Sequence, residues 1–249
     1  MKTTALTLKL TLGACIAAVL LSGSDAQAQS AEDALDSRFR AAEALIDARL
    51  TKEVVPGAAI GLVHDQALIW SHQFGVESLE TKAAITDDTL FSICSVSKLF
   101  TGVAAMNLVE ENRLSMDAPI SDYLNSTVLP GEVGAEEVVN VRNILSHVAG
   151  LPREGINDYW ADNSFPDTAG LRATITEQTQ LYKPYDHWQY SNLGMAMLGA
   201  AVAQASDTSW GDYVDETILT PLGMNATTLD MPFDQVGAGF ANGYYVRSP

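Results

Sequence analysis

Residues 58–74, with the sequence AAIGLVHDQALIWSHQF, indicate the class of fold. Two apolar runs, Ala58 to Val63 and Ala67 to Phe74, flank the short polar segment His64-Asp65-Gln66. Apolar runs of this length on either side of a short polar turn are typical of a β-hairpin. The sequence therefore predicts an antiparallel pair of strands in this part of the chain.

Helical patterns surround the predicted hairpin. Apolar residues recur at helical spacing before it, over Ser30–Leu50, and helices dominate after it to about Thr220. The later helices are expected over Ser95–Glu111, Val141–Ser146, Ser191–Ala205 and Trp210–Leu219. In the first of these later helices, we expect the core to receive Leu99, Val103, Met106 and Leu108. The pattern predicts an α/β fold of the α+β type, with an antiparallel β-sheet flanked by helices and a mostly helical region.

The composition is that of a folded, acidic protein. The chain has 249 residues, of which 47% are hydrophobic and 18% are charged, and these values exclude a disordered polymer. Its 14 basic residues are outnumbered by 31 acidic ones, which gives a net charge of -17. Because no basic run is present to neutralise phosphates, the sequence argues against nucleic acid and against an anionic membrane surface as partners.

The first 28 residues have the features of an export signal. Lys2 and Lys9 form a short positive region before an apolar stretch from Leu10 to Leu21. Ala26-Gln27-Ala28 then forms an A-x-A cleavage pattern. We therefore expect a signal peptide over residues 1–28, a folded domain over residues 29–249, and a periplasmic or secreted location. The alternative is a lipoprotein processed at Cys15, which the continuation of the apolar run past that residue disfavours.

Cleavage after residue 28 leaves one cysteine, Cys94, so no internal disulfide is expected. Cys94 immediately precedes a candidate nucleophile, and we interpret it as a small, buried packing residue rather than a reactive thiol. The four histidines form no metal-binding spacing, so neither a metal nor another cofactor is expected.

The segment Ser95-Val96-Ser97-Lys98 carries the first candidate chemistry. Residues three apart share one face of a helix, so the Lys98 amine would lie beside the Ser95 hydroxyl. A serine hydroxyl is a weak nucleophile and needs such a base beside it. Taken alone, this pattern also fits a helix-capping serine followed by an exposed lysine.

The segment Tyr190-Ser191-Asn192 is the second candidate. A tyrosine hydroxyl can transfer a proton, and an asparagine amide can hold a carbonyl group. In isolation, the same residues fit a core aromatic residue followed by a Ser or Asn helix cap.

These segments together resemble the serine β-lactamase-related family, which includes class C β-lactamases, D-alanyl-D-alanine peptidases and related esterases and D-aminopeptidases. Besides Ser95 to Lys98 and Tyr190 to Asn192, three other regions are similar to the family's signatures. These regions are the hairpin at Gly61–Gly75, the block Leu145-Ser146-His147 with Gly150-Leu151-Pro152, and the turn Pro221-Leu222-Gly223-Met224. The five signatures occur in the family's order, and the tyrosine in the second motif favours the class C and peptidase branch over class A.

The resemblance implies a role for each candidate residue. Ser95 would be the acylated nucleophile and Lys98 its base, while Tyr190 would transfer protons to the leaving group and help to activate water. Asn192 would contact the amide carbonyl of the substrate and the lysine, and the Ser95 backbone N–H would form half of an oxyanion hole. We interpret His147 as structural. The implied substrates are small molecules or peptide-like compounds: β-lactams, D-alanyl peptides or esters.

The sequence departs from the family pattern in two places. No [KH]-[TS]-G motif follows Tyr190, so we expect a C-terminally truncated copy of the fold that lacks its third active-site motif. Pro184-Tyr185 stands where relatives usually have Pro-Gly. The missing motif leaves open an alternative, a non-catalytic binding or sensor protein that keeps the penicillin-binding fold. A Ser-His-Asp hydrolase is disfavoured because the sequence contains no G-x-S-x-G elbow.

Overall fold

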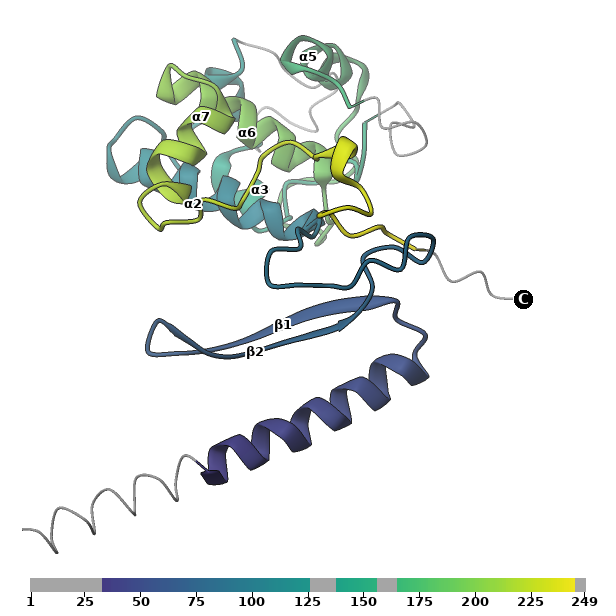
Figure 1. Cartoon of the computed structure of the whole chain (residues 1–249). Helices are drawn as coiled ribbons and strands as arrows, with labels where there is room; N and C mark the ends of the chain where they lie inside the picture. The colour runs from purple at the N-terminus through teal and green to yellow at the C-terminus, as the bar shows by residue number, and fades with distance from the viewer. Residues whose placement is uncertain (1–32, 126–137, 156–164, 245–249) are drawn as a thin grey trace, which may run out of the picture. The chain divides into compact units, whose positions relative to one another are not determined.

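The computed structural model describes residues 33–125, 138–155 and 165–244 (Figure 1). The predicted signal peptide and the alternative lipoprotein site at Cys15 lie outside these ranges. The chain divides into two compact units. One unit comprises Met1–Phe91 with Pro232–Pro249, and the other comprises Ser92–Met231.

The first unit contains the predicted hairpin, whose strands are β1 (Gly57–His64) and β2 (Ala67–Gly75). The strands pair antiparallel with Gly57 opposite Gly75, and the register shifts once between Leu62 and Val63. Asp65 and Gln66 form the connecting turn, and both have positive φ angles, 46° and 64°. Two central residues of this kind define a type I′ turn, whose twist matches that of the strands it joins. The hairpin prediction is confirmed.

A helix over residues 33–52 packs on one face of the hairpin. Trp70 and His72 point to the same face because side chains alternate along a strand. The Trp70 indole stacks on Phe39 with ring centroids 5.6 Å apart, and its Nε1 donates to the Glu43 carboxylate at 3.1 Å. His72 Nε2 lies 2.7 Å from the Asp47 carboxylate.

The second unit is built of helices around one apolar core. Its helices are α2 (Ser97–Glu110), α3 (Val141–Leu145), α5 (Thr168–Glu177), α6 (Asn192–Ser206) and α7 (Trp210–Val214). They are joined by the 3₁₀ turns η1 (Cys94–Val96) and η2 (Ile120–Tyr123) and by the π-helix η3 (Asp215–Leu219). Helix α6 contacts α2, α3, α5, α7 and η2, so it is the central helix of this unit (Figure 1). With the hairpin, these helices confirm the predicted α+β class.

The ends of α6 follow from its flanking residues. The Ser191 side chain accepts a hydrogen bond from the Gly194 N–H at 2.8 Å and caps the N-terminus. Asp207, at the C-cap, adopts the left-handed conformation that commonly ends a helix. Between these residues, the core receives Leu193, Met195, Met197, Leu198, Ala201 and Val202. The predicted helix over Ser191–Ala205 is therefore confirmed to within one residue at each end.

Helix α2 corrects the expectation about which of its residues form the core. Leu108 is buried as predicted, but Leu99, Val103 and Met106 are 68%, 48% and 39% exposed. The buried face instead carries Thr101, Ala104, Ala105 and Leu108, at the spacing of one helical stripe. Because both faces of α2 are apolar, hydropathy could not distinguish them; the small face packs on α6 because alanines allow helices a close approach.

Candidate active site

Ser95 lies in the 3₁₀ turn η1, immediately before α2, and its side chain is exposed. The residue before it, Cys94, has a φ of 46°, in the left-handed region. For a residue other than glycine this conformation costs about 1–3 kcal/mol, and such strain clusters at functional sites. The prediction that Cys94 is buried is wrong: its side chain is exposed, because no residue of η1 packs into the core.

Lys98 lies in the first turn of α2, one turn after Ser95. Its Nζ is 3.1 Å from Ser95 Oγ, which is hydrogen-bonding distance. The i, i+3 spacing seen in the sequence therefore produces the contact expected from it. The lysine side chain is half-buried, and its Nζ also lies 4.9 Å from the centroid of the Tyr190 ring.

Tyr190 lies two residues before α6 and completes this cluster. Partial burial acts to raise the pKa of Tyr190, but hydrogen bonds with Lys98 and Ser95, aided by the positive charges of Lys98 and Arg153, outweigh it. The pKa of the phenol is therefore lowered from its ordinary value of 10.0. A phenol with a lowered pKa gives up its proton more readily than one in water.

Asn192 is the first residue of α6, and its side-chain amide is held by a carboxylate. Asn192 Nδ2 donates to Glu154 Oε1 at 2.6 Å, and Arg153 Nε lies 3.3 Å from the same oxygen. The Arg153 carbonyl accepts from the Asn192 N–H at 2.8 Å. Neither Arg153 nor Glu154 was predicted from the sequence as a site residue. They directly follow Gly150-Leu151-Pro152, one of the family signatures, and this position was the one sequence feature that could have identified them.

His147 packs beside the cluster. Its ring lies 4.5 Å from the Tyr190 ring, centroid to centroid, and its Nδ1 accepts from the Ser191 N–H at 3.2 Å. Its carbonyl accepts from the Gln189 N–H at 2.8 Å, so both its side chain and its backbone hold the segment that carries Tyr190. Desolvation, followed by the charge of Lys98, lowers the pKa of His147 and favours the neutral ring.

Tyr185 stands where relatives usually have glycine, and its backbone still adopts a conformation that glycine favours. Tyr185 has a φ of 71°, in the region that disfavours a bulky residue. Its N–H donates to the Val148 carbonyl at 2.8 Å, and its side chain is 61% exposed. The chain therefore adopts at Tyr185 a turn that places strain a few residues before Tyr190.

Within the described ranges, no group of three or more His, Cys, Asp or Glu side chains is arranged to hold a metal ion. Among the helices in these ranges, none has the length and apolar character needed to cross a membrane.

Ser95 and Lys98 at the start of α2, beside Tyr190 just before α6, in an α+β fold are the arrangement expected of the serine β-lactamases and penicillin-binding proteins. The family model described as Beta-lactamase matches residues 42–245. The chain therefore belongs to the beta-lactamase family, and the resemblance predicted from its motifs is confirmed.

Relatives and solved structures agree with this assignment. Beta-lactamase-like protein 2 of Dictyostelium discoideum is 27% identical over 86% of this chain and 41% of its own length. The octameric penicillin-binding protein homologue from Pyrococcus abyssi superposes with a TM-score of 0.68 at 27% identity, over 82% of this chain and 47% of that one. A class C beta-lactamase mutant gives a TM-score of 0.68 at 25% identity, over 81% and 53%. The chain thus spans about half the length of the proteins it matches.

Proposed function

We propose that this protein is a serine hydrolase that cleaves amide, lactam or ester bonds through an acyl-enzyme, with Ser95 as its nucleophile. The observation that carries the proposal is the cluster of Ser95, Lys98 and Tyr190, with Lys98 Nζ 3.1 Å from Ser95 Oγ. All three side chains lie in one compact unit. A nucleophile within hydrogen-bonding distance of a base, next to a second proton donor, is the arrangement that acyl transfer needs.

The first half of the reaction forms the acyl-enzyme. Lys98 in its amine form takes the Ser95 hydroxyl proton as Oγ attacks the carbonyl carbon, giving a tetrahedral oxyanion. The Tyr190 phenol then donates its proton to the departing nitrogen or oxygen atom and regains one from the Lys98 ammonium. The carbonyl re-forms, the leaving group departs and the acyl group stays on Ser95. In the second half, Tyr190 passes its proton to the Lys98 amine as it takes one from water, and the hydroxide attacks the ester carbonyl. The tetrahedral intermediate then collapses, Ser95 Oγ leaves with a proton from the Lys98 ammonium, and the acid is released.

Asn192 would hold the acyl part of the substrate. Its amide is fixed by Glu154, which accepts from Nδ2 at 2.6 Å. One Nδ2 hydrogen is engaged, so the second is left for a substrate carbonyl and Oδ1 for a donor such as Lys98. We propose that Glu154 is a positioning residue for Asn192.

A hydrolysis panel tests the proposed function. Nitrocefin, p-nitrophenyl acetate and a D-alanyl p-nitroanilide sample the lactam, ester and peptide-like classes. We expect turnover of at least one compound, lost in Ser95→Ala and kept in Ser92→Ala, a control on an exposed serine three residues away. Equal background hydrolysis by the protein and by Ser95→Ala would contradict the proposal.

A second candidate is a non-catalytic binding or sensor protein that keeps the penicillin-binding fold. Its motivation is the likeness to the penicillin-binding protein homologue from Pyrococcus abyssi, with a TM-score of 0.68 at 27% identity. The lifetime of the acyl-enzyme distinguishes the two candidates. A sensor acylated by a fluorescent penicillin would keep the label for hours, whereas a hydrolase would release it during turnover.

We also propose that the protein is exported to the periplasm or secreted. The predicted signal peptide over residues 1–28 supports this location. N-terminal sequencing of the processed protein is expected to begin at Gln29. A mature chain that begins with a lipid-modified Cys15 would favour the lipoprotein alternative instead.

A further inference from the structure

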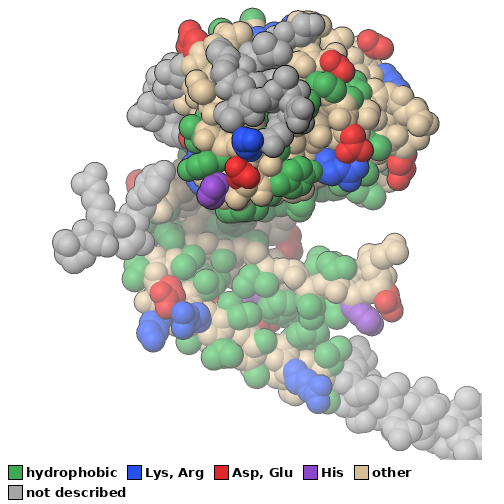
Figure 2. Space-filling view, turned by 180° about the vertical axis from the view of Figure 1, so that it is seen from behind, with side chains coloured by type: hydrophobic (Ala, Val, Ile, Leu, Met, Phe, Trp, Pro, Cys, Tyr) green, Lys and Arg blue, Asp and Glu red, His purple; other side chains and the backbone are tan. Residues whose placement is uncertain are grey.

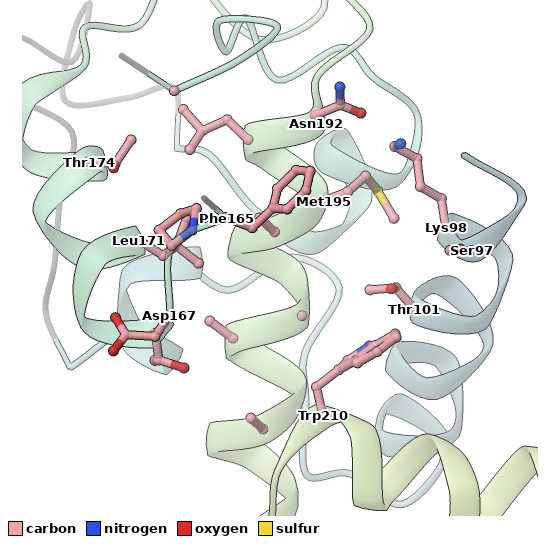
Figure 3. A pocket seen from close by; sticks show the side chains of 18 of the residues that line it. Ser97, Lys98, Thr101, Phe165, Asp167, Leu171, Thr174, Asn192, Met195 and Trp210 are labelled. Atoms are coloured by element: carbon pink, nitrogen blue, oxygen red, sulfur yellow. The ribbon is translucent and has the colours of Figure 1, made fainter. Parts of the chain in front are cut away.

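A groove of about 500 Å³ opens beside the cluster and runs along α6 (Figure 3). Lys98 and Asn192 lie at one end of it, and Trp210 lies at the other. Helix α2 contributes one wall, and the segment 165–174, which includes the first two turns of α5, contributes the opposite wall. The groove therefore connects two of the proposed site residues to a long space on the helical unit.

Beyond its Lys98 end, the large side chains that line this groove are mostly apolar, although Asp167, Thr174 and Ser209 also line it. Phe165, Leu171, Met195 and Trp210 supply large apolar surfaces, and small residues of α6 form the floor. Of the described residues that line it, only Lys98 and Asp167 carry charge. Asp167 caps α5 by accepting from the Gly170 N–H at 2.8 Å. An occupant of the groove is thus apolar along its length and polar at the end near Lys98.

The length of the groove follows from the residues of its floor. Asn192, Ala196, Gly199, Ala200 and Ala203 lie on one face of α6 and line it. From Asn192 to Ala203 is eleven residues, and at a rise of about 1.5 Å per residue the floor is about 16 Å long. Because these side chains are small, the groove above this face of α6 stays open along its length. Its shape suits an extended chain better than a single ring.

We infer that this groove binds the apolar acyl chain of the substrate, so that the preferred substrates are esters or amides of medium-chain acids. The inference rests on the proposed function and names its substrate class. Asn192, the residue proposed to hold the acyl carbonyl, lines the groove, whereas Tyr190, the residue proposed to protonate the leaving group, does not. The chain bound here is therefore on the acyl side of the scissile bond.

Binding of saturated carboxylates tests the inference without turnover. Acetate, hexanoate and decanoate are added to the full chain, and binding is followed by tryptophan fluorescence, with Trp210→Phe to identify the signal from the groove. Burial of a methylene group contributes about 0.8 kcal/mol when complete, so we expect the Kd to fall by about twofold to fourfold per methylene in this open groove. A Kd independent of chain length, or no response from Trp210, would overturn the inference.

A pair of variants locates the binding surface. Ala203→Leu fills the far end of the groove, and Gln204→Leu adds the same side chain at the next, exposed position outside it. We expect Ala203→Leu to weaken decanoate by about tenfold and to leave hexanoate unchanged, with no effect of Gln204→Leu. An equal loss for both acids, or for both variants, would contradict the inference. The chain-length series is measured on the wild-type protein, so a folding defect in a variant does not affect it.

The outcomes distinguish this inference from the proposed function. Chain-length-dependent binding without hydrolysis in the substrate panel would support the groove and contradict the hydrolase. Hydrolysis with no chain-length dependence, in binding or in kcat/KM, would support the hydrolase and overturn the groove.

Discussion

The two units of the chain differ in how they bury apolar side chains. The unit Ser92–Met231 has one continuous core that receives Leu108, Ile144, Leu198 and Val214, all 2% exposed or less. In the described part of the other unit, the buried hydrophobic residues are Ile85 and Phe240.

The surface of the hairpin unit reflects the same difference. In this unit, Leu62, Val63, Leu68 and Ile69 are all more than 40% exposed. Figure 2 shows hydrophobic side chains (green) spread over the visible surface of the hairpin and its helix. The candidate site lies entirely in the other unit, Ser92–Met231. The well-packed core of that unit can hold side chains in fixed positions.

The largest expected effect compares one leucine from each unit. Leu198→Ala, in the core of α6, should lower the free energy of unfolding by about 2–5 kcal/mol, because it leaves a cavity in a close-packed region. Leu68→Ala, at a site 63% exposed, should change it by less than about 1 kcal/mol. Urea denaturation followed by circular dichroism measures both. Equal destabilisation by the two changes would show that the two units do not differ in how they pack apolar side chains.

The next effect compares two carboxylates that each hold a neighbouring side chain. Glu154→Ala removes the acceptor of Asn192 Nδ2, and the loss of a bond to a charged group is worth about 1.5–3 kcal/mol. We expect acylation of Ser95 to slow by about tenfold to a hundredfold, with partial rescue in Glu154→Gln, whose carbonyl still accepts from the amide. Glu43→Ala removes the acceptor of Trp70 Nε1 in the hairpin unit and should leave acylation unchanged. If both variants slowed acylation equally, Glu154 would have no positioning role.

Tyr185→Gly should stabilise the helical unit. The φ of 71° at this residue suits glycine, and relief of the strain should raise the free energy of unfolding by about 1 kcal/mol. The exposed side chain contributes little packing, so little is lost. Thermal melting measures the change, with Tyr182→Gly as the control at a residue that is not among those with positive φ. A lower melting temperature for Tyr185→Gly would show that the tyrosine side chain stabilises the turn.

The smallest expected effect is a pH dependence centred on His147. Desolvation and then the Lys98 charge lower its pKa in the folded protein, whereas the unfolded chain has the ordinary value of about 6.5. The unfolded state therefore binds more protons below neutral pH, and the free energy of unfolding should fall as the pH decreases from about 7 to 5.

A pair of histidine variants checks this assignment. His147→Gln should flatten the decrease between pH 7 and pH 5, and His64→Gln, at an exposed histidine of the hairpin, should not. Denaturation series at several pH values measure the slope. An unchanged slope in His147→Gln would assign the pH dependence to another group.

Much of the fold and the contact between Ser95 and Lys98 were predictable because they depend on local spacing. A two-residue turn between apolar runs makes a hairpin, and an i, i+3 pair on a helix shares one face. The buried face of α2 was not predictable, because Leu99 and Leu108 lie on opposite apolar faces and only tertiary packing selects one. The Glu154 contact with Asn192 joins residues 38 apart, which no local pattern encodes.

The central claim is that Ser95 is an acylated nucleophile, and covalent labelling tests it most directly. The full chain is incubated with a fluorophosphonate and, separately, with a penicillin, and the adducts are located by mass spectrometry of tryptic peptides. We predict one adduct, on Ser95, that is lost in Ser95→Ala, persists in Ser92→Ala and forms at least a hundredfold more slowly in Lys98→Ala. A folded protein that acquires no label on Ser95 from either reagent would contradict the account.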